Sequence, residues 1–360
     1  MSSTTVNFIP PSSPPETHKA WTQVSSVPRE DQTKVPSIEK ALTFNQATST
    51  PKLAKSQQVL IKVVRCTLNP NDLLHLGGTY SVSQHIPMPR PMGFEGSGVV
   101  VESTASWIMG LKKGTRVAFY CGDGGGFGEY VVCDASAVVP ITDDVSFERA
   151  ACSMANPLSS IVMVDEAKGL GHKTILNTAA AGALGQCLYR YATKQGMDVI
   201  CIVRKQSQVD FLKKELGAKY VLNSNTPTFE KDLSVMMKET NCTFCYDCLA
   251  GDMPNLLLKT SPLPNTIVKV YGNMVSDDMT IDINSLSDGR KVDIFLVGES
   301  MSKMWIWTLL NIITKVKAWM SVVDEGIQVA KTYKLAEVPN ALADYGGDNK
   351  TAGKVQVDCM

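Results

Sequence analysis

The sequence predicts an α/β protein of two domains, in which a β-rich domain precedes a doubly wound parallel sheet. At 360 residues the chain has room for about two domains. Between residues 38 and 155, short apolar runs are separated by Gly, Pro and Asn, which is typical of a β-rich domain. After residue 156, apolar segments of helix and strand length alternate, which predicts parallel strands covered by helices.

The β-rich half begins after a segment without apolar periodicity. Residues 1–37 are rich in Pro, Ser and Thr and predict a disordered or extended arm. This segment lacks the apolar core of a secretory signal, and it has few basic residues for a mitochondrial presequence. We therefore expect a cytoplasmic protein, with the mitochondrial matrix as the alternative. Four strands are predicted after the arm, at 59–64, 98–101, 115–120 and 129–133.

The second half contains the predicted elements of the parallel sheet. A helix over 208–216 is expected to end at Gly217, because glycine is favoured at the left-handed position after a helix. Residues 338–343 and 354–357 predict a last helix and a closing strand. The other predicted elements are a helix at 228–239 and strands at 175–176, 199–203, 220–222, 243–248 and 267–271.

A turn of small residues follows the first of these strands. Ala180, Gly182 and Gly185 occupy the three positions of G-x-G-x-x-G, with alanine in place of the first glycine. These positions require small side chains for a tight turn, for close approach of backbone to a pyrophosphate, and for packing of helix on strand. Ala183 and Leu184 begin the helix, whose free N–H groups and positive dipole end favour an anion. The segment therefore predicts a dinucleotide site formed by these five residues.

The residues after the next strand indicate which dinucleotide binds. Strand 199–203 is followed by Arg204 and Lys205, where a site for NAD would carry Asp or Glu to bind the ribose 2′-hydroxyl. A guanidinium can form two parallel hydrogen bonds to a phosphate, so NADPH, with its 2′-phosphate, is the favoured cofactor. The alternative is that Arg204 is a solvated surface residue.

Composition argues against several other classes of function. The 35 basic and 35 acidic residues give no basic surface for nucleic acid. The most apolar window, 304–323, contains Lys315 and Lys317 and falls short of a membrane span, so we expect a buried or interface helix. The ten cysteines lack paired spacing, which suits a reducing compartment. Three of them have the spacing of part of an iron–sulfur run, but buried strand cysteines are the favoured interpretation; they are Cys242, Cys245 and Cys248.

Most of the chain after residue 38 resembles the medium-chain dehydrogenase/reductase superfamily, in its zinc-independent branch of quinone oxidoreductases and enoyl-thioester reductases. The resemblance implies a GroES-like catalytic domain at 38–157, completed by 326–360, and a Rossmann NADPH-binding domain at 158–325, with the active site in the cleft between them. The motifs that carry it are LNPNDLLHLGGTY (68–80), PMGFEGSGVV (91–100), GGFGEYVV (125–132), NPLSS (156–160), LGAKYVLNS (216–224) and GKVQV (353–357).

The resemblance also bears on zinc, which many members of the superfamily bind. The positions of their catalytic zinc ligands here hold Asn69, Phe94 within Gly93-Phe94-Glu95, and the segment 153–156, which has no well-placed ligand. The four closely spaced cysteines of the structural zinc lobe are missing between residues 102 and 113. We therefore expect an enzyme without metal.

Two residues are candidates for catalysis by this resemblance. Tyr80 matches the position of the proposed catalytic tyrosine of enoyl-thioester reductases, where a phenol would donate to the developing enolate oxygen. The alternative is that Tyr80 packs under the cofactor. Asn69, in the lost ligand position, would either contribute a second donor or only cap the loop.

Further cofactor contacts are implied at the ends of later strands. Tyr220 and Asn223 match positions that contact the adenine side, and Gly272 and Asn273 end a strand that lies near the nicotinamide in the family. Relatives are dimers or tetramers, so a homodimer or tetramer is expected, and residues 301–323 would suit its interface.

These features lead to three hypotheses of function. The first is an NADPH-dependent, metal-free oxidoreductase that transfers hydride to a small-molecule acceptor, a quinone or an α,β-unsaturated carbonyl. The second is a 2-enoyl-thioester reductase of fatty-acid synthesis, which Asn156-Pro157 favours and for which Arg90 is the candidate cation near Tyr80. The third is a non-catalytic NADPH-binding subunit whose Pro-rich arm docks a partner. NADPH oxidation against quinones, enones and enoyl-thioesters would separate them.

Overall fold

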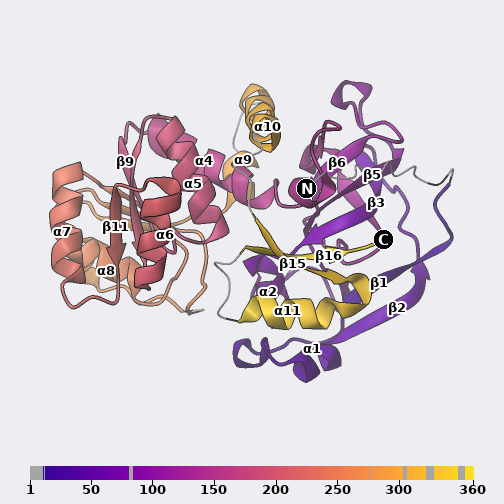
Figure 1. The fold of residues 1–360 in the computed structure, drawn as a ribbon, viewed down its shortest axis with the longest axis horizontal. Coiled ribbons are helices and arrows are strands. Elements are labelled where there is room, and N and C mark those ends of the chain that lie inside the picture. The colour runs from indigo at the N-terminus through magenta and orange to yellow at the C-terminus, as the bar shows by residue number, and fades with distance from the viewer. Residues whose placement is uncertain are drawn as a thin grey trace. The chain divides into compact units, whose positions relative to one another are not determined.

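The chain forms two compact units in a computed structural model (Figure 1). The structure describes residues 11, 13–80, 84–276, 278–302, 306–321, 328–347 and 353–360. Unit 1 comprises Met1–Ala155 and Ile313–Met360, and unit 2 comprises Asn156–Ile312. The first boundary lies close to the one expected at residue 157. The second lies inside helix α10 (Ile306–Ser321), earlier than the expected residue 325.

Unit 1 is built on two β-sheets. The larger sheet has the order β15-β16-β3-β5-β6-β8, with β7 also paired to β3, and the smaller has the order β2-β1-β4. The predicted strands at 59–64, 98–101, 115–120 and 129–133 correspond to β3, β5, β6 and β7. The strands are β1 (Thr17–Gln23), β2 (Leu42–Ser49), β3 (Gln58–Thr67), β4 (Arg90–Pro91), β5 (Glu95–Ser103), β6 (Arg116–Tyr120), β7 (Tyr130–Asp134), β8 (Val138–Pro140), β15 (Val329–Lys334) and β16 (Lys354–Asp358).

Part of the predicted N-terminal arm is folded into unit 1. Strand β1 pairs with β2, and Trp21 within it is only 7% exposed. The Trp21 indole donates to the carbonyl of Leu335 at 2.6 Å and its ring stacks on Phe44 at 4.8 Å. The prediction of a disordered or extended arm is therefore wrong from residue 17 onward, because a buried tryptophan and strand pairing stabilise this segment. Residues 1–10 lie outside the described part of the chain.

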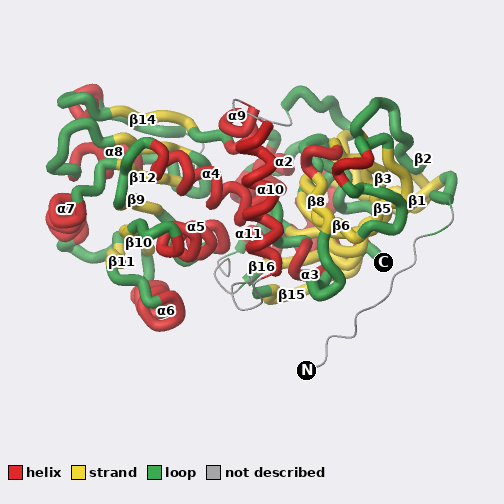
Figure 2. The backbone as a smooth tube through the Cα atoms, turned by 90° about the horizontal axis from the view of Figure 1, so that it is seen from above, coloured by secondary structure: helices red, strands yellow, loops and turns green. Residues whose placement is uncertain are grey.

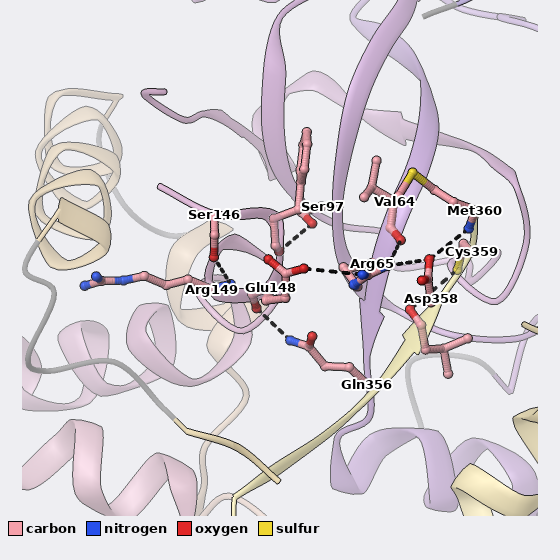
Figure 3. A network of polar contacts seen from close by, with 12 residues as sticks. Val64, Arg65, Ser97, Ser146, Glu148, Arg149, Gln356, Asp358, Cys359 and Met360 are labelled. Carbon is pink, nitrogen blue, oxygen red and sulfur yellow. Dashed lines mark hydrogen bonds and ion pairs between the residues drawn. The ribbon is translucent and has the colours of Figure 1, made fainter. Parts of the chain in front are cut away.

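The C-terminal strand completes the same unit. Strand β16 pairs antiparallel with β3 and parallel with β15. Arg65 of β3 forms ion pairs with Asp358 of β16 and with Glu148, the latter at 3.3 Å (Figure 3). Gln356 donates to the carbonyl of Glu148 at 2.6 Å. These contacts attach the C-terminal strand to residues that lie more than 200 positions earlier in the sequence.

Short helices surround these sheets. They are α1 (Val35–Ala41), α2 (Pro70–Gly77), α3 (Phe147–Ala150) and α11 (Val338–Gly346). Helix α11 contributes Val338, Ala341 and Leu342 to the apolar core of unit 1, where they cluster with Ile38 of α1. Helix α10 has buried residues at Ile312, Val316, Trp319 and Met320, in agreement with its expected burial.

Unit 2 is a six-stranded parallel sheet. Its order is β11-β10-β9-β12-β13-β14, so the strand order reverses between β9 and β12. Figure 2 shows these strands side by side, with α7 and α8 on one side of the sheet and α4 and α5 on the other. Because both faces are covered, β9 and β12 are buried along their whole length. The strands are β9 (Thr174–Asn177), β10 (Asp198–Val203), β11 (Tyr220–Asn223), β12 (Phe244–Asp247), β13 (Ile267–Val270) and β14 (Lys291–Ile294).

The helices of unit 2 follow the predicted alternation. Helix α6 ends at Gly217, which adopts the left-handed conformation with φ of 67°. Cys242, Cys245 and Cys248 lie buried in and around β12 as free thiols, which agrees with the interpretation as buried strand cysteines. The helices are α4 (Ala155–Gly169), α5 (Ala183–Lys194), α6 (Gln206–Leu216), α7 (Phe229–Thr240), α8 (Met253–Thr260) and α9 (Val297–Ser302). Among the helices that the structure describes, none combines the length and apolarity needed to cross a membrane.

Candidate functional site

The small-residue turn of unit 2 lies between β9 and α5, at the point where the strand order reverses. Gly182 is the N-cap of α5, and its N–H donates to the carbonyl of Ala179 at 2.9 Å. A Cβ on Gly185 would lie 2.5 Å from the carbonyl oxygen of Ala180, closer than real side-chain contacts. The helix can therefore approach the turn only because residue 185 is glycine.

The first turn of α5 presents backbone groups that can bind an anion. Ala183, Leu184 and Gly185 open the helix, and the first N–H groups of a helix have no acceptor within it. Twelve residues of helix align their peptide dipoles so that the positive end faces the turn. The structure thus brings together the five residues Ala180, Gly182, Ala183, Leu184 and Gly185 in the arrangement expected for a pyrophosphate.

Arg204 and Asn223 lie at the same edge of the sheet. Val203, the last residue of β10, is paired with Asn223 of β11. Gln208 accepts from the backbone N–H groups of Arg204 and Lys205, both at 3.2 Å, which fixes the start of α6. The Arg204 side chain is exposed. This edge therefore carries two adjacent cations beside Asn223.

Tyr220 does not join this edge. It is the first residue of β11 and pairs with Ile200, whereas Asn223 is the last residue of the same strand. The expectation that Tyr220 lies beyond the strand beside Asn223 is therefore wrong, and its contact with the cofactor stays a prediction. The Lys219 ammonium lies 4.6 Å from the centre of the Tyr220 ring at the amino end of the strand.

Gly272 and Asn273 follow β13 at the carboxyl edge. A Cβ on Gly272 would lie 3.1 Å from the carbonyl oxygen of Cys248, so the chain here is closely packed against the segment after β12. Tyr271 donates to Asn177, the last residue of β9, at 3.1 Å. The ends of β9, β12 and β13 are thus joined at the strand-order reversal.

Thr178 and Asp247 link the ends of β9 and β12 by hydrogen bonds. Neither residue was predicted from the sequence. Thr178 donates to the carboxylate of Asp247 at 2.7 Å and accepts from the N–H of Cys248 at 3.0 Å. Asp247 also accepts from the N–H of Ala250 at 2.8 Å. Burial raises the pKa of Asp247, and these hydrogen bonds partly oppose the rise. A polar residue at each of two strand ends is the signal that would have indicated them.

In unit 1, Tyr80 lies just after α2 with its hydroxyl 3.0 Å from that of Tyr120. Asn71 donates to the Tyr120 hydroxyl at 3.0 Å. The Tyr80 ring meets Phe94 edge-on at 5.5 Å. Burial raises the pKa of Tyr80, which keeps the phenol protonated at neutral pH.

Asn69 makes hydrogen bonds to buried protein groups at both ends of its amide. Its nitrogen donates to Glu95 at 2.6 Å, and its oxygen accepts from the Lys354 ammonium. It is also the N-cap of α2, where its own N–H donates to Asp72 at 2.7 Å. With an exposed fraction of 3%, this side chain is suited to the capping role left open by the sequence, and less to contact with a substrate.

The surroundings of Asn69 contain three buried ionisable groups. Glu95 accepts from the N–H groups of Met154 and Ala155 at 2.8 and 2.7 Å. Lys354, which is 2% exposed, is the cation of this cluster. Burial raises the pKa of Glu95, and it raises the pKa of Asp72 from 3.8 to about 7. Hydrogen bonds and one ammonium therefore hold this cluster in an apolar interior.

The other positions that correspond to zinc ligands are position 94 and the segment 153–156, which Cys152 precedes. Phe94 is fully buried, edge-on to His75 at 5.0 Å and stacked on Tyr120 at 6.3 Å. Cys152 contacts Gln356 at 3.1 Å and Thr67 at 3.3 Å. Within the described ranges, no group of three or more His, Cys, Asp or Glu side chains is arranged to hold a metal ion.

Arg90, the candidate cation of the enoyl-thioester reductase hypothesis, is held inside unit 1. It is 4% exposed and donates to Gln23 at 2.9 Å and to the carbonyl of His75 at 2.6 Å. These bonds hold it inside unit 1, where it cannot bind the phosphate of an acyl carrier.

Comparison with known proteins supports the same architecture. Residues 55–143 match the alcohol dehydrogenase GroES-like domain. A crystal structure from Mesorhizobium loti, of a protein assigned as an NADPH:quinone reductase, superposes with a TM-score of 0.82 at 28% identity, covering 96% of this chain and 99% of that one. The chain belongs to the medium-chain dehydrogenase/reductase superfamily. The predicted fold class, a Rossmann sheet plus a GroES-like domain, is confirmed for this superfamily member.

Sequence relatives include enoyl-[acyl-carrier-protein] reductases, quinone oxidoreductases and highly reducing polyketide synthases. The mitochondrial enoyl-[acyl-carrier-protein] reductase of Arabidopsis thaliana is 26% identical over 65% of this chain, and the quinone oxidoreductase-like protein 2 homolog of Nematostella vectensis is 31% identical over 61%. The aligned regions span 63% and 59% of those relatives, less than two thirds of their length.

Proposed function

We propose that the protein is an NADPH-dependent, metal-free reductase that transfers a hydride to a quinone or to an α,β-unsaturated carbonyl. The observation that carries the proposal is the turn between β9 and α5, where the helix starts against Ala180 at the strand-order reversal. In an open α/β sheet this is the place where a dinucleotide binds.

The residues at this edge fit a dinucleotide phosphate group. Gly182 and Gly185 carry no side chain at the start of α5, so at these two positions a pyrophosphate could approach the backbone N–H groups. Asn223 ends β11 and Gly272 follows β13, on opposite sides of the strand-order reversal at the same edge, where the adenine and nicotinamide halves would extend. NADPH, when bound, supplies the hydride.

The proposed preference for NADPH rests on Arg204 and Lys205. Both follow β10 at the position where an acidic residue would otherwise bind the ribose 2′-hydroxyl. Two cations favour a phosphate there, and the guanidinium can bind it in a bidentate manner. Arg204→Ala should therefore weaken NADPH binding about 10-fold or more while changing NADH binding little; equal losses would show that Arg204 does not bind the 2′-phosphate.

Tyr80 is the proposed proton donor. During reduction, negative charge develops on the carbonyl oxygen of the acceptor, and a hydrogen-bond donor aimed at that oxygen lowers the barrier. The Tyr80 phenol retains its proton at neutral pH because burial raises its pKa. Asn69 has a supporting role in this scheme: it caps α2, the helix that precedes Tyr80.

The residues at the zinc-ligand positions support a reductase without metal. The Asn69 amide is bonded at both its nitrogen and its oxygen, to Glu95 and Lys354, and Phe94 offers no ligand atom. An ammonium at this position opposes the binding of a second cation. Metal analysis of the purified protein is expected to find no stoichiometric zinc.

A second candidate is a 2-enoyl-thioester reductase, favoured by the mitochondrial enoyl-[acyl-carrier-protein] reductases among its relatives. The burial of Arg90 removes one of its two sequence arguments, the candidate cation near Tyr80, and leaves the Asn156-Pro157 motif. Oxidation of NADPH measured with quinones, enones and enoyl-thioesters decides among these acceptors. NADPH binding without turnover on any of them would instead support the non-catalytic subunit. The oligomeric state and the cytoplasmic location stay predictions.

A further inference from the structure

Three polar side chains of unit 1 form a continuous chain of hydrogen bonds that ends at Tyr80. Asn71 lies in the first turn of α2, Tyr120 is the last residue of β6, and Tyr80 follows α2. The Asn71 nitrogen lies 3.0 Å from the Tyr120 hydroxyl, which lies 3.0 Å from the Tyr80 hydroxyl. All three side chains are half-buried, so water competes weakly for these bonds.

The donors and acceptors fix a direction for this chain. An amide nitrogen only donates, so the Tyr120 oxygen accepts from Asn71. The one proton of Tyr120 can then be donated to the Tyr80 oxygen, so this contact does not use the Tyr80 proton. The reverse direction would use the Tyr80 proton inside the protein and leave none for a substrate.

We infer that Tyr120 and Asn71 are positioning residues that turn the Tyr80 hydroxyl outward and stabilise the phenolate left after its proton is donated. This inference rests on the proposed function, in which Tyr80 is the proton donor. Neither Tyr120 nor Asn71 contacts the reacting atoms in this scheme; both act through Tyr80.

The proton balance of the step requires such support. NADPH gives two electrons as hydride to the acceptor carbon, the O–H bond of Tyr80 breaks, and a new O–H bond forms on the acceptor oxygen. The Tyr80 oxygen is then an anion in a half-buried site until it takes a proton from water. A hydrogen bond from Tyr120 to this anion is charge-assisted and stronger than the one to the neutral phenol. The bond therefore stabilises the transition state, in which Tyr80 becomes an anion, more than the resting state, and so lowers the barrier.

The two phenols have different acidities, as this assignment of roles requires. Burial raises the pKa of both, but hydrogen bonds from Tyr120 and Asn71 partly oppose the rise at Tyr80. At Tyr120 the neighbouring Tyr80 adds to the rise. Tyr80 thus ionises first, and Tyr120 stays a protonated donor. Phe94 lies edge-on to the Tyr80 ring and stacks on the Tyr120 ring, so it helps to hold the two rings in place.

The test is the variant Tyr120→Phe, which removes one oxygen and keeps the ring that stacks on Phe94. With the acceptor found for the enzyme, we expect kcat to fall about 10- to 100-fold while the Kd for NADPH is unchanged. Asn71→Ala should lower kcat by a smaller factor. Tyr333→Phe is the matched control, because it removes a phenol bonded to Asp344 at 2.8 Å elsewhere in unit 1, and it should leave kcat unaltered.

A double-mutant cycle with Tyr80→Phe separates this inference from the proposed function. If Tyr120 acts through Tyr80, adding Tyr120→Phe to Tyr80→Phe should cost little further activity. A large loss in Tyr80→Phe with full activity in Tyr120→Phe would overturn the positioning role alone. Full activity in Tyr80→Phe would overturn the proposed donor itself.

A readout that needs no substrate completes the test. The pKa of Tyr80 can be measured from phenolate absorbance, as the difference between proteins that carry Tyr80 and their Tyr80→Phe counterparts. This pKa should rise in Tyr120→Phe, because the Tyr80 phenolate loses a hydrogen-bond donor. An unchanged or lower pKa would show that Tyr80 donates to Tyr120 and would overturn the assigned direction.

Discussion

The substitution Gly185→Ala tests whether the start of α5 is as closely packed as the cofactor site requires. The new methyl group would lie 2.5 Å from the oxygen, 2.6 Å from the Cα and 2.7 Å from the carbonyl carbon of Ala180. Ordinary contacts begin at 3.4 Å, so helix and turn must separate by about 0.9 Å. All three neighbours are backbone atoms, so no side chain can rotate away.

The expected magnitude follows from two opposing terms. Overpacking against backbone costs up to about 3 kcal/mol, and the better helix propensity of alanine offsets about 1 kcal/mol of it. A net loss of about 2 kcal/mol should lower the melting temperature of unit 2 by roughly 4–8 °C. The displaced N–H groups should also raise the Kd for NADPH at least 10-fold, a change of about 1.4 kcal/mol.

Thermal unfolding and a fluorescence titration with NADPH measure the two effects. Gly169→Ala is the matched control, because Gly169 ends a helix of the same unit and a methyl group there meets nothing within 4 Å. It should keep or slightly raise the melting temperature. If Gly185→Ala behaves like this control in both assays, the close approach is not required and the reasoning is refuted.

Two further predictions concern the buried polar cluster of unit 1. Lys354→Met should destabilise the protein to urea by about 3–5 kcal/mol, since it leaves the Glu95 carboxylate without its cation, and adding Glu95→Gln should restore part of that loss. An additive double variant would show that the two charges do not interact. Burial raises the pKa of Asp72 from 3.8 to about 7, so the folded state binds this proton more tightly than the unfolded state. The contribution of Asp72 to stability therefore falls as pH rises from 3.8 to about 7. Asp72→Asn should therefore lose stability less steeply than the parent over that interval in urea unfolding at a series of pH values; an equal slope would assign the titration to another group.

The elements that local sequence specifies were predicted well. The end of α6 at Gly217 and the small-residue turn before α5 depend on backbone conformation and close approach, which glycine and alanine satisfy within a few residues. Arg204 follows β10 as predicted, because a strand end is set by the length of its apolar run.

The predictions that failed depended on partners far apart in the chain. The residues 17–23 were assigned to an arm because the contact of Trp21 with Leu335 cannot be seen locally. Tyr220 was grouped with Asn223 although the two lie at opposite ends of β11, since one short strand does not show where its neighbours begin. Tyr120 was overlooked for a similar reason: it meets Tyr80 only when β6 and α2 are packed together.

The sequence by itself determined the superfamily, the small-residue turn before α5 and the cations after β10, because these depend on short motifs whose steric and charge requirements are local. Only the tertiary structure decided what Asn69 does. Its partners Glu95 and Lys354 lie 26 and 285 residues away, and burial makes their hydrogen bonds obligatory. Tertiary packing likewise placed a phenol and an amide behind Tyr80, since side chains on separate elements become neighbours only when the core closes around them.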